Sequence, residues 1–298
     1  MTICPFGGIV NGDENRPIRR PVISARPFDT TAYRQPSERF ILALTLILVL
    51  LVIVLTSTAT FCLSGVFVLA MVVISYLSSR STHQALLQSG WRITPQDTPV
   101  LAAMVDQIAA RLRPGPLEVF VAEAKTLNAY TFGLSSPKVI VLHAPLLQVM
   151  APDELSFIVG HEMGHVRLGH TVLNSLVGGM AGIPSPFLAS ALLTAVFLWW
   201  NRACETSADR AGLLACGRLD TAVLALVKLT TDTTVRTQAD LDRALAVINA
   251  EDDSLLGELG EVLATHPLMA HRIERLQRYA RTAEYRRLQG LVDRNVGK

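Results

Sequence analysis

The chain has few charged residues and few cysteines, and these shortages exclude several classes of protein. Charged residues make up 17% of the 298 positions and hydrophobic residues 50%, whereas an average soluble domain carries about 25% charge. That balance excludes a chain that is disordered throughout, and it indicates a membrane component. The four cysteines have no Cys-x-x-Cys spacing and are too sparse to cross-link the chain, so we expect free thiols. With 27 basic and 25 acidic residues, the net charge predicts no nucleic-acid partner.

One long segment lacks charge completely. The 38 residues 40–77 contain no Asp, Glu, Lys, Arg or His. A single helix of that length would be about 57 Å long, nearly twice the hydrocarbon core of about 30 Å. The polar run at 56–60 divides the segment into two short spans, so we predict a transmembrane helical hairpin over residues 40–78. A pair of buried core helices is the alternative.

The regions that flank this hairpin predict its orientation. Arginines precede the first span and follow the second, and the turn has no basic residue, which places both ends in the cytoplasm. Residues 1–39 hold five of the 15 prolines and mixed charge, without the apolar core of a signal peptide. We therefore expect a flexible cytoplasmic tail at 1–39.

Beyond the hairpin, residues 79–298 read as one α+β domain that is mostly helical. Thr98 and Pro99 open an amphipathic helix, and a second helix starts at Pro152. Two short apolar runs, Leu117 to Val121 and Lys138 to Leu142, read as strands separated by a loop. We expect a small sheet packed among helices.

The second of these helices carries a metal-binding motif. His161, Glu162 and His165 form the pattern His-Glu-x-x-His. Two histidines four residues apart differ by about 40° around a helix axis, so both rings can reach one ion. The glutamate between them is placed to take a proton from a water molecule at that ion. This motif predicts a zinc site.

A catalytic zinc site needs a third protein ligand. His170 is a poor candidate, because it is turned about 140° from the face that carries His165. No Asp or Glu lies between Glu162 and Glu205, so elimination favours Glu205 as the third ligand. Asp209, one helical turn later, would then hold a ligand histidine in orientation. The reverse assignment, with Asp209 as the ligand and Glu205 as its support, stays open.

The order of the motifs resembles a known family. His161-Glu162-x-x-His165, Glu205-x-x-x-Asp209 and the later Thr265-His266-Pro267 are similar to the motifs of the membrane zinc metalloproteases of the HtpX and prenyl-protein CAAX endoprotease family. The many spans of the CAAX endoproteases do not fit a chain of this length with one clear hairpin. The bacterial HtpX branch is therefore the nearer relative.

The resemblance implies more than the motifs do. It implies a gluzincin-type metalloprotease fold that binds one zinc ion per chain. It also implies that a substrate strand lies along the sheet edge near Asn128. His266 and Arg272 would line the cleft and stabilise the oxyanion of the tetrahedral intermediate. Apart from the resemblance, Cys204 points about 100° away from Glu205 on a helix, so we interpret it as a structural thiol.

A second charge-free stretch lies between the two parts of the metal motif. Residues 171–200 contain no charged residue and are interrupted by Pro184 and Pro186. We expect the first half to continue the motif helix, and Trp199-Trp200 at the end is typical of an interfacial anchor. The stretch is either a hydrophobic hairpin that enters the bilayer or a soluble pair of helices over the cleft, and both interpretations remain. The basic segment from residue 266 onward either attracts anionic lipid headgroups or packs on the domain.

These observations predict a membrane-anchored zinc endopeptidase. We expect it in a bacterial inner membrane, with its catalytic domain in the cytoplasm. Its partners would be the lipid bilayer and protein or peptide substrates, chiefly membrane proteins under quality control, with no nucleic acid. A chaperone-like protein that retains zinc but turns over little, and a structural membrane protein without metal, are the alternatives.

Overall fold

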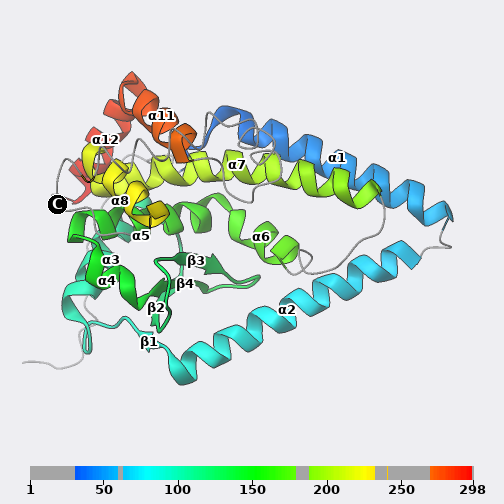
Figure 1. Ribbon diagram of the computed structural model, residues 1–298, viewed down its shortest axis with the longest axis horizontal. Helices are drawn as coiled ribbons and strands as arrows, with labels where there is room; N and C mark the ends of the chain where they lie inside the picture. The colour runs from blue at the N-terminus through cyan, green and yellow to red at the C-terminus, as the bar shows by residue number, and fades with distance from the viewer. Residues whose placement is uncertain (1–30, 60–62, 179–187, 232–239, 241–268, 297–298) are drawn as a thin grey trace, which may run out of the picture.

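The computed structural model describes residues 31–59, 63–178, 188–231, 240 and 269–296. Over these ranges the chain is mostly helical, with one four-stranded sheet, which confirms the predicted balance of elements. Figure 1 shows two long helices that converge at one end of the molecule, and the sheet with most of the other helices at the opposite, broader end. The helices are α1 (Pro36–Ala59), α2 (Leu63–Ser89), α3 (Pro99–Leu112), α4 (Ala144–Val149), α5 (Pro152–Leu168), α6 (His170–Gly178), α7 (Leu188–Cys216), α8 (Leu219–Thr231), α11 (Met269–Ala280) and α12 (Ala283–Val296).

The sheet has the strand order β1-β2-β4-β3. Strands β2 and β4 run parallel, and β1 and β3 pair antiparallel at the two edges. Strands β2 and β4 match the two predicted apolar runs, whereas β3 lies in the segment that was predicted as a loop, and no strand was predicted at β1. The strands are β1 (Trp91–Arg92), β2 (Leu117–Ala122), β3 (Ala129–Phe132) and β4 (Lys138–His143).

Both faces of the sheet are covered, and this explains the continuous apolar sequence of its central strands. Ile140 and Leu142 belong to the main core, which includes residues of α3 and α5. Val139 and Val141, on the alternate positions of the same strand, pack with Leu86 of α2. The sheet therefore lies between α2 on one side and the helices α3 and α5 on the other.

Small residues bring α5 and α7 close together. An added Cβ at Gly160 of α5 would lie 2.3 Å from the Cβ of Ala215, and one at Gly164 would lie 2.7 Å from the Cβ of Ala211. Both distances are far shorter than an ordinary carbon–carbon contact of about 3.5–4.0 Å. The absence of a side chain at these two positions allows the backbones to approach, and the metal motif on α5 consequently faces α7.

Helices α1 and α2 cover the segment where a transmembrane hairpin was predicted. Their bounds are wider than that segment, since α1 starts at Pro36 and α2 continues to Ser89. Among the residues placed in the structure, no helix reaches the combination of length and hydropathy that defines a candidate membrane span. The last residues assigned to the tail are packed: Tyr33 and Glu38 are both fully buried. The rest of the predicted tail, residues 1–30, lies outside the described residues.

The second charge-free stretch differs from expectation at its start. The motif helix does not continue through residue 171, because Gly169 adopts a left-handed φ of 82° and ends α5 at Leu168. A separate helix, α6, begins at His170. Residues 179–187, which include both prolines of the predicted break, lie outside the described residues. Of the expected anchor pair, Trp199 is 41% exposed but Trp200 is buried among Ile41 and neighbouring residues of α7.

Candidate metal centre

Three side chains from two helices converge in the interior. His161 and His165 lie one turn apart on α5, and Glu205 faces them from α7. All three are at most 9% exposed. Their ligand atoms lie within 4.8 Å of one another. The fold therefore brings Glu205, the carboxylate selected from the sequence by elimination, next to both histidines.

The spacing of these atoms fits a tetrahedral zinc ion. With bonds of about 2.0–2.2 Å, two ligands of a tetrahedral zinc lie about 3.3–3.5 Å apart. The Nε2 atoms of His161 and His165 are 3.1 Å apart. Glu205 Oε2 lies 3.5 Å from His161 Nε2, and Glu205 Oε1 lies 3.4 Å from His165 Nε2. The donor set, two imidazoles and a carboxylate, is also the chemistry that a catalytic zinc takes.

Asp209 meets the other nitrogen of His161. Its Oδ1 lies 3.0 Å from His161 Nδ1, on the side of the ring away from Glu205. Arg272 of α11 donates to the same carboxylate, from Nε to Oδ2 at 3.0 Å and from Nη2 to Oδ1 at 2.6 Å. Asp209 thus contacts the ring nitrogen opposite the one that faces Glu205, and it is not among the three residues whose ligand atoms converge.

The electrostatics of the site favour a cation. Although burial lowers it, hydrogen bonds to Asp209 and Glu205 raise the pKa of His161 to about 10. Burial would raise the pKa of Glu205, but hydrogen bonds from the two histidines and the charge of Arg272 hold it well below its usual range. The site therefore keeps its carboxylates ionised and attracts positive charge next to the imidazoles.

Glu162, the predicted proton carrier, is held by the edge strand. Thr131 of β3 donates from Oγ1 to Glu162 Oε2 at 2.5 Å. Glu162 is 7% exposed. Asn128 directly precedes β3, is exposed, and its carbonyl accepts a hydrogen bond from the His143 amide at 3.0 Å. Sequence reasoning missed both the strand and Thr131, because four residues with mixed burial give no clear period-2 signal.

His165 also has a partner behind its ring. Its Nδ1 lies 3.0 Å from His170 Nδ1, and His170 Nε2 lies 2.9 Å from Glu38 Oε1. Burial lowers the pKa of His170 to about 4, against the raising effect of the hydrogen bond to Glu38. His170 is thus directed away from the ligand atoms, as its angle predicts, but it is part of the site. No sequence signal pointed to Glu38, which was assigned to the tail.

Of the remaining residues discussed from the sequence, Arg272 and Cys204 lie in the described part of the chain and His266 does not. Arg272 is buried at 8% exposure, and it contacts Asp209 and, at 3.5 Å, Glu205. His266 lies outside the described residues. Cys204 is fully buried in a small apolar group with Ile41 and Trp200, as expected of a structural thiol.

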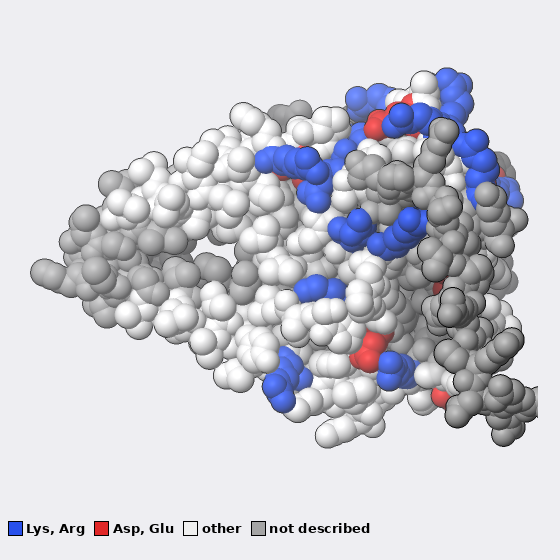
Figure 2. Space-filling model, turned by 180° about the vertical axis from the view of Figure 1, so that it is seen from behind, with Lys and Arg blue, Asp and Glu red and all other residues white. Residues whose placement is uncertain are grey.

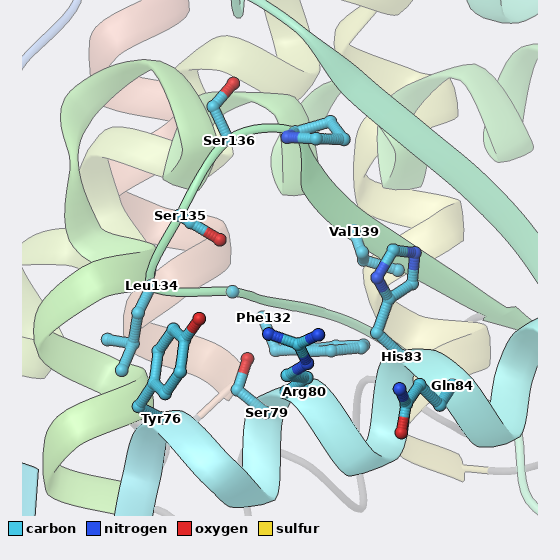
Figure 3. Close-up of a pocket in the computed structure, with 12 residues that line it drawn as sticks. Tyr76, Ser79, Arg80, His83, Gln84, Phe132, Leu134, Ser135, Ser136 and Val139 are labelled. Carbon is cyan, nitrogen blue, oxygen red and sulfur yellow. The ribbon is translucent and has the colours of Figure 1, made fainter. Parts of the chain in front are cut away.

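A separate cavity lies between α2 and the turn that joins β3 to β4 (Figure 3). It has a volume of about 310 Å³. Tyr76 and Arg80 line it from α2, and Phe132 and Val139 line it from the sheet. These two sheet residues pack toward α2 with Leu86, so the cavity lies on the face of the sheet opposite α5 and is distinct from the metal centre.

The mostly helical fold with its small sheet, together with a buried His-Glu-x-x-His helix completed by a distant glutamate, defines a metalloprotease. Residues 95–280 match the profile of peptidase family M48, and the chain belongs to this family. This confirms the resemblance that the motifs indicated.

Relatives matched by sequence agree with the family match. The chain is 28% identical over 185 residues to the plastoglobule-localized metallopeptidase 48, chloroplastic, of Arabidopsis thaliana, which covers 57% of this chain and 54% of that protein. It is 25% identical over 260 residues to a Protease HtpX homolog of Streptococcus thermophilus, covering 72% and 86% of the two chains. The crystal structure of S. mikatae Ste24p aligns with a TM-score of 0.44 and 20% identity, over 72% of this chain and 56% of that one. The chain thus spans about half of the plastid relative and most of the HtpX homologue.

Proposed function

We propose that the chain is a zinc-dependent endopeptidase in which His161, His165 and Glu205 hold one zinc ion. The observation that carries the proposal is the convergence of the two histidine Nε2 atoms, 3.1 Å apart, on the Glu205 carboxylate. One oxygen of this carboxylate lies 3.5 Å from His161 Nε2 and the other lies 3.4 Å from His165 Nε2, close to the ligand separations of a tetrahedral zinc site. The fourth corner is left for the water that hydrolysis consumes.

The proposed reaction depends on Glu162 as a proton carrier. When bound, zinc would polarise the scissile carbonyl and lower the pKa of a water molecule. The Glu162 carboxylate takes one proton from the water as its oxygen bonds to the carbonyl carbon. Glu162 then delivers this proton to the nitrogen of the leaving amine as the C–N bond breaks. Thr131 donates to one carboxylate oxygen and so leaves the other for the proton.

Further residues bind the substrate and organise the ligands. Strand β3 pairs with β4 and forms one edge of the sheet. Thr131 connects this edge to Glu162, the proposed general base, through a hydrogen bond. We assign the substrate backbone to this edge, starting near Asn128. Arg272 uses two donors on Asp209, so we assign it to the support of that carboxylate. The oxyanion role implied by the resemblance then falls to His266.

The proposed anchor is the pair α1 and α2. Large apolar side chains are exposed along both helices: Leu46, Ile47, Leu50, Leu51, Val54, Val66, Leu69, Val72, Val73, Ile74 and Leu77. Figure 2 shows no Lys, Arg, Asp or Glu on the described part of the tapered end, whereas Lys and Arg gather over the broad end. An apolar surface of this size is costly in water and is stabilised by lipid. We therefore assign the tapered end to the bilayer and the broad end to the cytoplasmic side, since basic residues flank the helices.

The anchor also indicates a substrate class. A catalytic centre adjacent to the bilayer meets membrane proteins and their exposed loops. We propose that these are the substrates and that quality control of a bacterial inner membrane is the role. The first half of α7 begins near the convergent end of α1 and α2 and lies along α1, so residues 188–200 are assigned to the same membrane-facing layer (Figure 1).

The test is a comparison of two glutamates on one helix. The purified full chain in detergent is assayed for zinc content and casein cleavage, beside Glu162→Gln and Glu154→Gln. Glu154 is the matched control, because it is buried on α5 but pairs with Lys228 instead of the site. The proposal expects about one zinc ion in all three proteins, with cleavage lost only in Glu162→Gln. Absence of zinc in the wild type, or cleavage that survives in Glu162→Gln, contradicts it.

A further inference from the structure

We propose that Glu38 and His170 position the zinc ligand His165, so that the first turn of the anchor helix α1 completes the metal site. The inference rests on the proposed zinc site but goes beyond it, because it gives the membrane-anchor segment a role in metal binding. Glu38 is 0% exposed and His170 is 1% exposed, and neither is used in the proposed reaction.

Protons can be placed in only one order along the three side chains His165, His170 and Glu38 when His165 binds a metal. His165 can offer Nε2 to a metal only as the tautomer that carries its proton on Nδ1. That Nδ1–H then donates to His170 Nδ1 at 3.0 Å, so His170 must carry its own proton on Nε2. His170 Nε2–H donates to Glu38 Oε1 at 2.9 Å. Each step allows one direction only, and the carboxylate at the end therefore selects the tautomer that binds metal.

Besides His170, two further residues bind the Glu38 carboxylate. Arg34 forms an ion pair with Oε1, and Ser207 of α7 donates to Oε2. Arg34 also donates to the carbonyl of Leu168 at the end of α5, at 2.6 Å. The amide of Gln35 donates to Ser207 Oγ at 2.9 Å. The start of α1 is thus bound to both helices that carry metal ligands, so its position sets the orientation of the His165 ring.

The two ligand histidines are supported in parallel ways. The Nδ1 atom of His161 meets a carboxylate, Asp209, that is paired with an arginine of α11. The Nδ1 atom of His165 reaches a carboxylate, Glu38, through His170, and this carboxylate is also paired with an arginine. Such partners hold ligand rings in place and raise their basicity. The parallel indicates that the second arrangement serves the metal as the first does.

A different use of the same residues is a second metal site. One ligand atom each of Glu38, His170 and Cys204 lies within 4.8 Å of the other two. However, the guanidinium of Arg34 already occupies one oxygen of Glu38, and both ring nitrogens of His170 have hydrogen-bond partners. A divalent ion there would have to displace the ion pair and the link to His165. The positioning role needs no such rearrangement.

The experiment measures zinc affinity by competition with a chelator, on the full chain in detergent and below the unfolding temperature of the metal-free proteins. Glu38→Ala and His170→Phe should each weaken zinc binding by about 10–100-fold. Because the two residues act in series, the double variant should bind zinc no more weakly than His170→Phe alone. Glu38→Gln keeps an acceptor oxygen, so its loss should be smaller than that of Glu38→Ala. The matched control Glu154→Gln, which breaks a buried ion pair elsewhere, should keep the wild-type affinity.

Three results would overturn the inference. The first is a zinc affinity within about twofold of wild type in both single variants, because removal of a residue that positions a ligand should weaken zinc binding by about 10–100-fold. The second is a double variant whose loss is the product of the single losses, since that would show independent effects. The third is a second zinc ion in the wild type that Glu38→Ala removes. Casein cleavage is measured separately: a wild type that binds zinc but does not cleave contradicts the proposed function and leaves this test intact.

Discussion

Replacing Gly160 with alanine tests whether the close approach of α5 to α7 builds the metal site. The new Cβ would lie 2.3 Å from the Cβ of Ala215 and 3.2 Å from the Cα of Gly212. To reach an ordinary contact of about 3.5 Å, the helices must separate by about 1 Å at this point. Overpacking of this kind costs about 1–3 kcal/mol in the free energy of unfolding. It should also weaken zinc binding, because Glu205 moves away from His161 and His165.

Gly290→Ala in α12 is the matched control, since a Cβ there meets nothing within 4 Å. Both replacements gain about 1 kcal/mol of helix propensity, so the difference between them isolates the overpacking. Thermal unfolding of the full chain in detergent, followed by tryptophan fluorescence, should place Gly160→Ala about 2–12 °C below Gly290→Ala. In a double-mutant cycle, Ala215→Gly should recover at least about 1 kcal/mol of the loss. Equal melting temperatures, or a cycle without coupling, would refute the packing argument.

Three further outcomes follow from the site. Thr131→Val removes the hydrogen bond to Glu162, and kcat for casein should fall about tenfold while zinc affinity stays unchanged; a fall in affinity instead would contradict the role given to Thr131. Asp209→Asn leaves the buried Arg272 guanidinium without its main charged partner, so the free energy of unfolding should fall by about 3 kcal/mol. An unchanged melting temperature would count against a stabilising ion pair between Asp209 and Arg272. Burial raises the pKa of the Cys204 thiol well above its usual value, so iodoacetamide should modify it only after unfolding, as peptide mass mapping would show.

The sequence contains enough information to predict the metal-bearing elements. Pro152 fixes the start of α5, and the four-residue spacing places His161 and His165 on one face of that helix. The apolar runs of β2 and β4 predict strands because both are buried on two faces. These features are local, since each is set by residues within one element.

The features that were missed are those that depend on long-range contacts. Glu38 meets His170 across 132 positions of the chain, and Thr131 meets Glu162 across 31. Neither pair leaves a periodic pattern in the sequence. The proline-rich composition before residue 39 predicts a tail, although Tyr33 is completely buried against the core. Such docking is decided by the shape of the whole domain, which a single sequence read locally does not contain.

We have proposed that His161, His165 and Glu205 hold one catalytic zinc ion. The most direct test is the zinc content of the purified full chain beside its Glu205→Ala and Asp209→Ala variants, after dialysis against a chelator of intermediate strength. We expect about one zinc ion in the wild type, none in Glu205→Ala, and zinc with weakened affinity in Asp209→Ala. Zinc retained in Glu205→Ala but lost in Asp209→Ala would contradict this ligand set and assign the third ligand to Asp209.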